Sequence, residues 1–283
     1  MKKVKNIFVV LTYINSDDLI DFLDSVSNCV DDYQVIVVNS FHDAESKNKI
    51  EQIAKNYNCD FLNVENKGYS YGNNRGIEYA LQNYNFQYLT VSNADIIIRS
   101  YSTNLLPKEG IFAGILIAKK GHMQNPMIVK ENNFSEKLIY EAFVHGTKWK
   151  FILGVGLNKI FREIFLFTHA MKKPSANGQG LRLFTISQAH GSFLTFSRDS
   201  LFRLWDGADT GFKGIFDENI FLFAEESVLA KRAKALGIPV YYSNFAVCHH
   251  KEDGSMKLSH VDIGGELAKA NIYAYEHYAV KKH

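Results

Sequence analysis

Apolar runs and helical patterns alternate along the first hundred residues of the chain. Each short apolar run ends in a polar turn and is followed by a segment whose apolar residues recur every three or four positions. Strands are predicted at residues 7–13, 34–38, 60–64 and 88–91. Helices are predicted from Ser16 or Asp17 onward, over 44–57, and through Ile77, Leu81 and Tyr84. This alternation predicts an α/β fold with a mostly parallel central sheet and helices on both faces.

Polar segments follow three of these predicted strands. They occupy residues 39–43, 68–75 and 93–95. In open parallel sheets, ligands bind beyond the carboxyl ends of the strands. We therefore expect the three segments to meet at one ligand-binding edge.

The alternation breaks between residues 124 and 186. Order typical of a core resumes at residue 187, a late strand is predicted at 239–248, and a final helix is predicted over 265–283. Residues 172–180 are predicted to form a mobile loop. The chain thus divides into 1–123, a helical insertion at 124–186, a second part at 187–256, and a C-terminal helix at 257–283.

The segment 148–167 combines aromatic and aliphatic residues with Lys148, Lys150, Lys159 and Arg162. Such a mixture suits a helix that lies on the inner leaflet of a membrane. It equally suits helices buried against the rest of the protein, or a contact between two copies in a homodimer. We favour burial.

Composition narrows the class of protein. A hydrophobic fraction of 46% and a charged fraction of 22% are ordinary for a soluble globular protein with a proper core. The net charge of +2 gives no reason to expect nucleic acid as a partner. Cys29, Cys59 and Cys248 cannot all pair and show no CxxC spacing, which fits a reducing cytoplasm. The short apolar run near the N-terminus reads as a strand, because no cleavage site follows it.

Two adjacent acids, Glu225 and Glu226, follow an apolar run and begin a predicted helix that ends at Gly237. A helix N-terminus carries about half a positive charge, so we expect both carboxylates to stay ionised. An ionised acid held at the end of an apolar segment can act as a general base. Acids also fill the first turn of many helices for stability alone.

The triplet Asn93-Ala94-Asp95 closes a predicted strand. A carboxylate in this place can hold Mg²⁺ or Mn²⁺, since both ions prefer oxygen ligands and phosphates of a substrate complete their coordination. Manganese also tolerates imidazole, so His249 or His250 at another strand end can add a ligand. The alternative is that Asn93 and Asp95 only make a turn.

Gly68, Gly72 and Gly76 are spaced four residues apart, which excludes the GxGxxG pattern of dinucleotide folds. These glycines and Asn73 can let the backbone approach a ligand, and Arg75 can contact a phosphate. Glycine-rich segments are also common as plain loops.

Seven segments, in chain order, resemble the family 2 glycosyltransferases with a GT-A fold, in particular the bacterial rhamnosyltransferase-like members. They are LTYINSDD from residue 11, VVNSFHD from 37, NKGYSYGNNRGI from 66, VSNADIII from 91, HGSFLTFSRDSL from 190, FDENIFLFAEESVLAKRAKALG from 216 and VCHH from 247. The resemblance covers residues 5–118 and 186–256. It implies a nucleotide-sugar-binding half at 1–123 and an acceptor and catalytic half at 187–256.

The resemblance also implies a donor site. Thr12, Tyr13 and Asp43 are expected to line the nucleotide, together with Asn39, which stands where the family often has a base-contacting Asp. The other implied donor contacts are Gly68, Asn73, Arg75, Asn93, His190, Gly191 and Ser192.

The metal and the catalytic base follow from the same resemblance. Asp95 corresponds to the main ligand of Mn²⁺ or Mg²⁺, and His249 to a late metal or phosphate contact. Glu226 corresponds to the catalytic-base Asp and Glu225 to its partner. The implied reaction is sugar transfer, with inversion, from a UDP- or dTDP-sugar to a glycan or lipid-linked glycan of a bacterial surface polysaccharide.

The chain departs from the family pattern at four positions. Asn39 and Ala94 replace Asp and Pro, Glu226 is one methylene longer than Asp, and Val228 replaces an acid. These departures motivate an alternative, a nucleotide-sugar- or glycan-binding protein of the same fold with weak or no turnover. A nucleotidyltransferase is less favoured, since no glycine- and lysine-rich phosphate loop follows the first strand. We expect a cytoplasmic protein, with the inner face of the membrane as the place of any peripheral contact.

Overall fold

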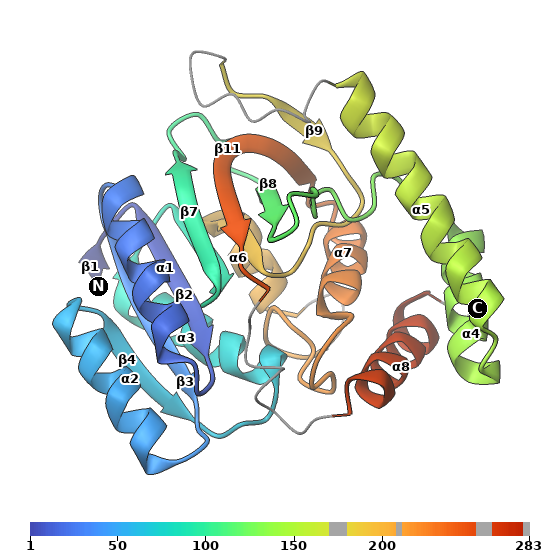
Figure 1. The fold of residues 1–283 in the computed structure, drawn as a ribbon. Coiled ribbons are helices and arrows are strands. Elements are labelled where there is room, and N and C mark those ends of the chain that lie inside the picture. Colours follow the sequence, from blue (N-terminus) through green and yellow to red (C-terminus); the bar gives the residue numbers. More distant parts are fainter. Residues whose placement is uncertain (170–179, 208–210, 253–261, 280–283) are drawn as a thin grey trace.

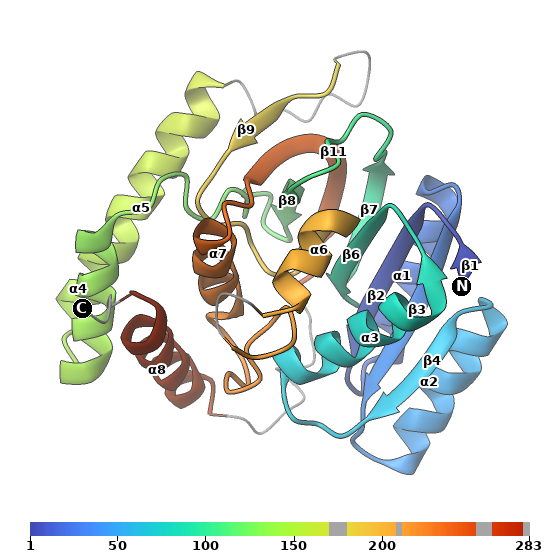
Figure 2. The same ribbon diagram turned by 180° about the vertical axis from the view of Figure 1, so that it is seen from behind.

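The computed structural model describes residues 1–169, 180–207, 211–252 and 262–279. A nine-stranded sheet forms its centre, in the order β4-β3-β2-β6-β10-β8-β11-β7, with β9 paired to β11. Helices cover both faces of the sheet, as Figures 1 and 2 show from opposite sides. The predicted α/β class is therefore confirmed. Of the predicted loop at 172–180, only Gly180 lies within the described residues.

The first part of the chain builds a parallel sheet with helical crossovers. Strands β4, β3, β2 and β6 all pair in parallel. The elements are β2 (Asn6–Thr12), α1 (Ser16–Cys29), β3 (Tyr33–Ser40), α2 (Ala44–Asn56), β4 (Asp60–Val64), α3 (Tyr69–Asn83) and β6 (Tyr88–Asn93). A small separate sheet pairs β1 (Lys2–Lys3) with β5 (Tyr84–Asn85). Each of the four strands predicted here is present, within two residues at either end.

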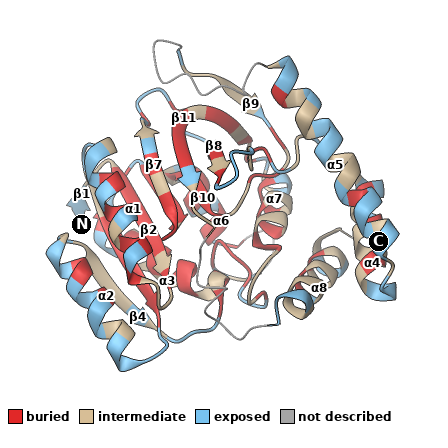
Figure 3. Cartoon of the chain, viewed as in Figure 1, coloured by how far each residue is buried: buried red, intermediate tan, exposed pale blue. Residues whose placement is uncertain are grey.

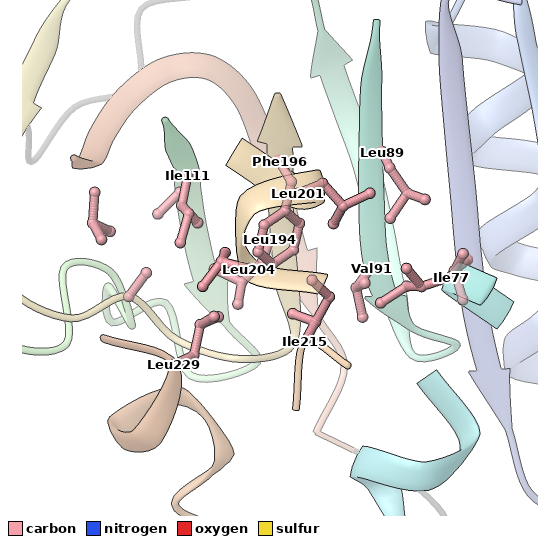
Figure 4. Close-up of a cluster of buried hydrophobic side chains, with 14 of the residues drawn as sticks. Ile77, Leu89, Val91, Ile111, Leu194, Phe196, Leu201, Leu204, Ile215 and Leu229 are labelled. Atoms are coloured by element: carbon pink, nitrogen blue, oxygen red, sulfur yellow. The ribbon is translucent and has the colours of Figure 1, made fainter. Parts of the chain in front are cut away.

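Side chains of the central strands point alternately into two cores. Ile7 and Val9 of β2 belong to the core beneath α3 and α6, which includes Ile77. Phe8 and Val10 belong to the core beneath α1 and α2. Strands buried on both faces need apolar residues at every position, which explains the unbroken apolar runs. Figure 4 shows the first of these cores, where side chains of α3, β6, β8, β10, α6 and α7 meet.

The second part of the sheet is mixed. Strand β10 lies antiparallel between β6 and β8, and β11 runs parallel to β8 but antiparallel to β7 and β9. The predicted mostly parallel order thus holds for the first part alone, because β10 enters the sheet in the opposite direction. The elements are β7 (Ile96–Tyr101), β8 (Ile111–Ala118), β9 (Leu183–Thr185), β10 (Phe193–Ser197), α6 (Arg198–Trp205), α7 (Glu225–Ala235) and β11 (Val240–His250).

A helical part flanks the sheet beyond α7. It consists of α4 (Asn133–His145), α5 (Lys148–Thr168), α8 (Ile263–Ala274) and a π-helix, η2 (Tyr275–Ala279). Ala270 and Ala274 of α8 pack against Ala224 and Val228 at the start of α7. The buried carboxylate of Asp217 accepts hydrogen bonds from the hydroxyls of two tyrosines of this part, at 2.9 Å from Tyr273 and 2.7 Å from Tyr278. These contacts fasten the C-terminal helix over α7.

The glycine-rich segment differs from its predicted form. Helix α3 begins at Tyr69, so Gly72 and Gly76 lie inside a helix and not in a loop. A Cβ at Gly72 would lie 2.5 Å from Leu11 Cδ1, and one at Gly76 would lie 2.4 Å from Val9 Cγ1. The two glycines therefore let α3 approach β2 closely. A further small difference is that Asn15 caps α1, in place of Ser16 or Asp17.

Candidate active site

The ends of three parallel strands meet at one edge of the sheet. The register places Thr12 of β2 beside Asn39 of β3, and Leu11 of β2 beside Asn93 of β6. The same edge carries Asp95, in the turn that joins β6 to β7. The convergence expected from the strand pattern is present for these residues.

Asp95 faces a histidine across this edge. Its buried carboxylate lies 3.3 Å from His250 Nε2. The other ring nitrogen, His250 Nδ1, is 2.9 Å from Gln124 Oε1, and the Gln124 amide nitrogen donates to Glu252. Because Gln124 presents its oxygen, Nδ1 carries the proton that forms this bond. The facing atoms, Nε2 and a carboxylate oxygen, then attract each other only through a shared cation, which is either a proton or a metal ion.

The donor set at Asp95 suits a divalent cation such as Mn²⁺. It offers one carboxylate and one imidazole, whose second nitrogen is oriented by an amide oxygen, as in many metal sites. Within the described residues, no group of three or more His, Cys, Asp or Glu side chains is arranged to hold a metal. Phosphate oxygens and water would therefore supply the remaining ligands, which is how such sites usually bind a nucleotide.

His249, the predicted ligand, does not face Asp95. It is exposed and pairs in register with Ile97 of β7, whereas its neighbour His250 pairs with Ile96. Successive side chains of a strand point to opposite faces, so only one of the two histidines can reach the carboxylate. His250, and not His249, is therefore the histidine positioned to bind a metal ion together with Asp95.

His190 lies next to His250, with ring centroids 5.7 Å apart. Its Nδ1 accepts the backbone N–H of Ser192 at 3.2 Å, so the proton of the neutral ring is on Nε2. Burial, reinforced by His250, lowers the pKa of His190 to about 4 despite the opposing effect of Asp95. His190 is thus a neutral hydrogen-bond donor near pH 7. The backbone N–H of His190 donates to Asn125 Oδ1 at 2.7 Å.

The acid pair stands at the N-terminus of α7, after two strained residues. Phe223 and Ala224 have φ angles of 71° and 60°, a left-handed conformation that costs residues other than glycine about 1–3 kcal/mol each. Burial, and secondarily Glu226, raises the pKa of Glu225 to about 8. Burial also raises the pKa of Glu226. The expectation that both acids stay ionised is not met for Glu225, because the loss of hydration outweighs the helix N-terminus.

Tyr69 and Gly191 connect the acid pair with the Asp95 edge. The Tyr69 hydroxyl donates to the carbonyl oxygen of Gly191 at 2.9 Å, and a Cβ at Gly191 would lie 3.5 Å from Glu226 Oε2. Burial raises the pKa of Tyr69 well above its ordinary value, and the charges of Glu225, Glu226 and Asp95 add to this effect. One phenol therefore lies within electrostatic reach of all three acids.

A cleft of about 890 Å³ opens beside these groups. Glu226 and His190 contribute to its wall, together with residues of α4, α5, α7 and α8. In Figure 1 these four helices lie on the right, and α1 and α2 lie on the left. The volume is in the range of small-molecule binding sites.

Several predicted donor contacts are already engaged within the protein. Arg75 pairs with Glu218 at 2.7 Å and lies over the Tyr71 ring. Asn73 is fully buried and donates to the Tyr69 carbonyl. Gly68 has a φ of 99°, and a Cβ there would lie 2.3 Å from Phe221 O. These residues build the fold at this place, and their roles as donor contacts stay predictions.

Of the predicted nucleotide-site residues, Asp43 and Tyr13 are accessible at the rim of the sheet edge, and Asn39 is buried. Asp43 is exposed and caps α2 by accepting Ser46 N–H at 2.7 Å, a bond that lowers its pKa. Tyr13 Oη lies 3.1 Å from His42 Nδ1, so these side chains share the rim of the edge. Asn39 is buried and donates to Asn63 Oδ1 at 2.7 Å.

Three residues of this arrangement were not predicted, namely Tyr69, Gln124 and Asn125, whereas His250 was one of the two histidines offered as a ligand. Tyr69 lies within the GYSYGNN segment, which signals a special backbone but not a role for the phenol. Gln124 and Asn125 lie in the segment predicted to be a helical insertion, where nothing in the sequence marks them.

Comparisons with known proteins bear on the fold. No family profile and no curated protein matches the sequence. Among solved structures, GalNAc-T7 with UDP, GalNAc and Mn²⁺ matches with a TM-score of 0.56 at 10% identity, over 96% of this chain and 48% of that one. TarS of S. aureus matches with a TM-score of 0.49 at 14% identity, over 87% of this chain and 36% of that one.

A mannosyltransferase of Pyrobaculum calidifontis, PcManGT, in complex with GDP-Man and Mn²⁺, matches with a TM-score of 0.47 at 14% identity, over 97% of this chain and 71% of that one. The chain thus spans less than half the length of the first two. At these identities a likeness shows the fold, and GalNAc-T7 carries that conclusion. The protein has a GT-A-type α/β fold, like that of GalNAc-T7.

Proposed function

We propose that the protein is an inverting glycosyltransferase of the family 2 type that uses a nucleotide diphosphate sugar, such as a UDP- or dTDP-sugar. Its acceptor is a glycan or lipid-linked glycan of a bacterial surface polysaccharide. One observation supports the proposal: His190 lines the same cleft as Glu226 and lies next to His250, which faces Asp95. The GT-A-type fold and the resemblance of the sequence motifs support it.

Asp95 and His250 would hold the metal ion, Mn²⁺ or Mg²⁺. When bound, this ion supplies positive charge to the departing diphosphate. Thr12, Tyr13, Asn39 and Asp43 would border the nucleotide at the same sheet edge. His190 adds a neutral N–H donor that can meet a sugar hydroxyl or a phosphate oxygen without introducing a charge.

Glu226 would be the general base. A base works best when its pKa lies near the operating pH, and burial moves the pKa of Glu226 upward in that direction. Glu225, with a pKa of about 8, holds the proton of the pair at neutral pH. In its ionised form Glu226 would accept the proton of the acceptor hydroxyl, and the hydroxyl oxygen would attack the anomeric carbon opposite the leaving diphosphate.

Donor turnover tests this proposal. Purified protein is incubated with UDP-, dTDP- or GDP-sugars, with and without Mn²⁺, and release of the nucleoside diphosphate is measured for the wild type and for Glu226→Gln. We expect metal-stimulated release by the wild type with one donor, and a loss of at least tenfold in the variant. Equal turnover of the two proteins would remove Glu226 from the mechanism.

A second candidate is a nucleotide-sugar- or glycan-binding protein of the same fold with little turnover. Asn39 stands where the resembled family often has a base-contacting Asp, and its amide nitrogen donates to Asn63. Thermal shifts with the same donors separate the two functions. Stabilisation that rises with donor concentration, without turnover under any condition, would favour the binding protein.

We also propose a cytoplasmic location, at the inner face of the membrane when the acceptor is lipid-linked. Cys29, Cys59 and Cys248 are unpaired, as expected of a reducing compartment. Within the described residues, no helix has the length and apolar character that crossing a bilayer requires.

A further inference from the structure

Helix α5 exposes an apolar stripe along its outer face. The side chains of Trp149, Leu153, Ile160, Ile164 and Phe167 are 59%, 42%, 59%, 55% and 76% exposed. Their spacing of four, seven, four and three residues places them on one side of the helix, over a length of about 30 Å. Figure 3 shows α5 mostly exposed or intermediate along its whole length. We call these five residues the outer stripe.

The inner side of α5 is already occupied. Gly154 packs against Ile139 of α4, and its carbonyl accepts the Ser135 hydroxyl at 2.7 Å. Leu166 is buried in the core beneath α3 and α6. Phe151 and Val155 line the cleft that contains Glu226. These contacts hold the helix in place without the outer stripe, so burial of the segment against the rest of the protein, which the sequence favoured, does not occur.

The charges on α5 are unequal. It carries Lys148, Lys150, Lys159 and Arg162 against the single acid Glu163, a net charge of 4 − 1 = +3. Lys148 is exposed at the start of the helix, next to Trp149 of the outer stripe. Lys150 pairs with Glu141 of α4, and Lys159 and Arg162 line the cleft. A long basic side chain such as Lys148 can extend its ammonium group to phosphates while its methylenes cover apolar surface.

We propose that the outer stripe docks on the surface of a membrane that contains anionic phospholipids. Apolar side chains would enter the interface between head groups and acyl chains, with Lys148 on the phosphates. A second copy of this chain fits less well, since pairing two such helices brings +3 against +3. Because the inner side of α5 lines the cleft, docking would place the cleft next to the lipid surface. That this position serves a lipid-linked acceptor rests on the proposed function.

Vesicle flotation tests the docking. The full chain is mixed with vesicles of phosphatidylcholine alone, or of equal parts phosphatidylcholine and phosphatidylglycerol. We expect the protein to float with the anionic vesicles and to be released as the salt concentration rises. The double variant Ile160→Ser/Ile164→Ser should bind about tenfold or more weakly, because apolar area drives insertion. Lys148→Gln should weaken binding by a smaller factor.

Leu105→Ser is the matched control. Leu105 is 69% exposed in the loop between β7 and β8, so its substitution removes equally accessible apolar surface elsewhere and should leave vesicle binding unchanged. Circular dichroism of each variant verifies folding. Absence of flotation with either vesicle, or equal flotation of the wild type and the double variant, would overturn the proposal.

Two further measurements separate this proposal from its rivals and from the proposed function. A dimer in sedimentation velocity that the double variant abolishes would assign the stripe to a second copy and overturn membrane docking. The double variant should keep wild-type donor turnover in solution, whereas Glu226→Gln should lose turnover and keep vesicle binding. Each proposal can therefore fail without the other.

Discussion

The two groups of acidic residues in the candidate site, Asp95 and the Glu225–Glu226 pair, differ in the side chains that surround them. Asp95 faces the imidazole of His250 at 3.3 Å, in a turn at the sheet edge. Glu225 and Glu226 are consecutive residues at the start of α7, and burial raises the pKa of both. In the proposed mechanism, the first centre holds a metal ion and the second exchanges a proton. Similar residues thus acquire separate tasks from their neighbours and not from their identity.

The largest effect is expected at the proton-exchanging centre. Glu226→Gln keeps the size and the hydrogen-bonding capacity of the side chain but removes its basicity, so kcat should fall by about 10²–10⁴-fold. Metal-dependent stabilisation by the donor, measured by thermal shift, should stay unchanged. A variant that loses donor binding together with turnover would contradict the separation of the two centres.

Substitutions at Asp95 and His250 should instead affect the metal-dependent binding of the donor. Asp95→Asn and His250→Gln should each abolish the Mn²⁺-dependent part of donor stabilisation, which at a hundredfold excess over Kd amounts to about 2.7 kcal/mol. His249→Gln is the control, because this neighbouring side chain is exposed on the other face of β11. A larger effect for His249→Gln than for His250→Gln would contradict the geometry.

The pKa of Glu225 predicts a pH dependence of stability. Its folded-state value of about 8 exceeds the ordinary 4.5. Between these values the unfolded chain releases a proton that the folded protein keeps, so the free energy of unfolding falls as the pH rises through this window.

Glu225→Gln should remove this fall in the free energy of unfolding with rising pH. Its free energy of unfolding relative to the wild type should rise by a few kcal/mol from pH 5 to pH 9, at about 1.4 kcal/mol for each pKa unit. Urea unfolding at several pH values measures the difference. Glu51→Gln, at a half-exposed position of α2, should show no comparable trend. A parallel pH profile for wild type and Glu225→Gln would contradict the raised pKa.

The smallest effect is expected from the C-terminal helix. Tyr278→Phe removes one of the two tyrosine hydroxyls that donate hydrogen bonds to Asp217. The free energy of unfolding should fall by about 1 kcal/mol. Because α8 packs on Ala224 beside the acid pair, kcat should fall slightly while Mn²⁺-dependent donor stabilisation remains. Loss of metal dependence in this variant would indicate that the two centres are coupled.

The sequence was informative wherever local pattern determines structure. The first four strands and the helices between them follow from apolar runs and helical periodicity. Because parallel strands align their carboxyl ends, the meeting of Thr12, Asn39 and Asn93 could be predicted without coordinates. The helix that begins at Glu225 could likewise be predicted, since its C-terminal glycine marks its end.

Other features depend on contacts between distant segments. The choice between His249 and His250 depends on the register of β11, which shifts between Val247 and Cys248 and which a sequence cannot reveal. The protonation of Glu225 depends on burial by surrounding elements. The outer stripe of α5 has the composition of a core helix, so its exposure becomes evident only once the other helices are placed.

The position of β10 has a consequence for dissecting the protein. Among the strands of the described residues, β8 pairs with β10 and β11, and both come from the later half of the chain. A fragment that stops near residue 118 would leave β8 without a neighbour and one side of β6 open, and such unprotected edges invite association with other chains. Strands from the two halves therefore alternate in one sheet, with β10 between β6 and β8. Splitting or swapping them at residue 123 would yield insoluble pieces and not separate donor and acceptor modules.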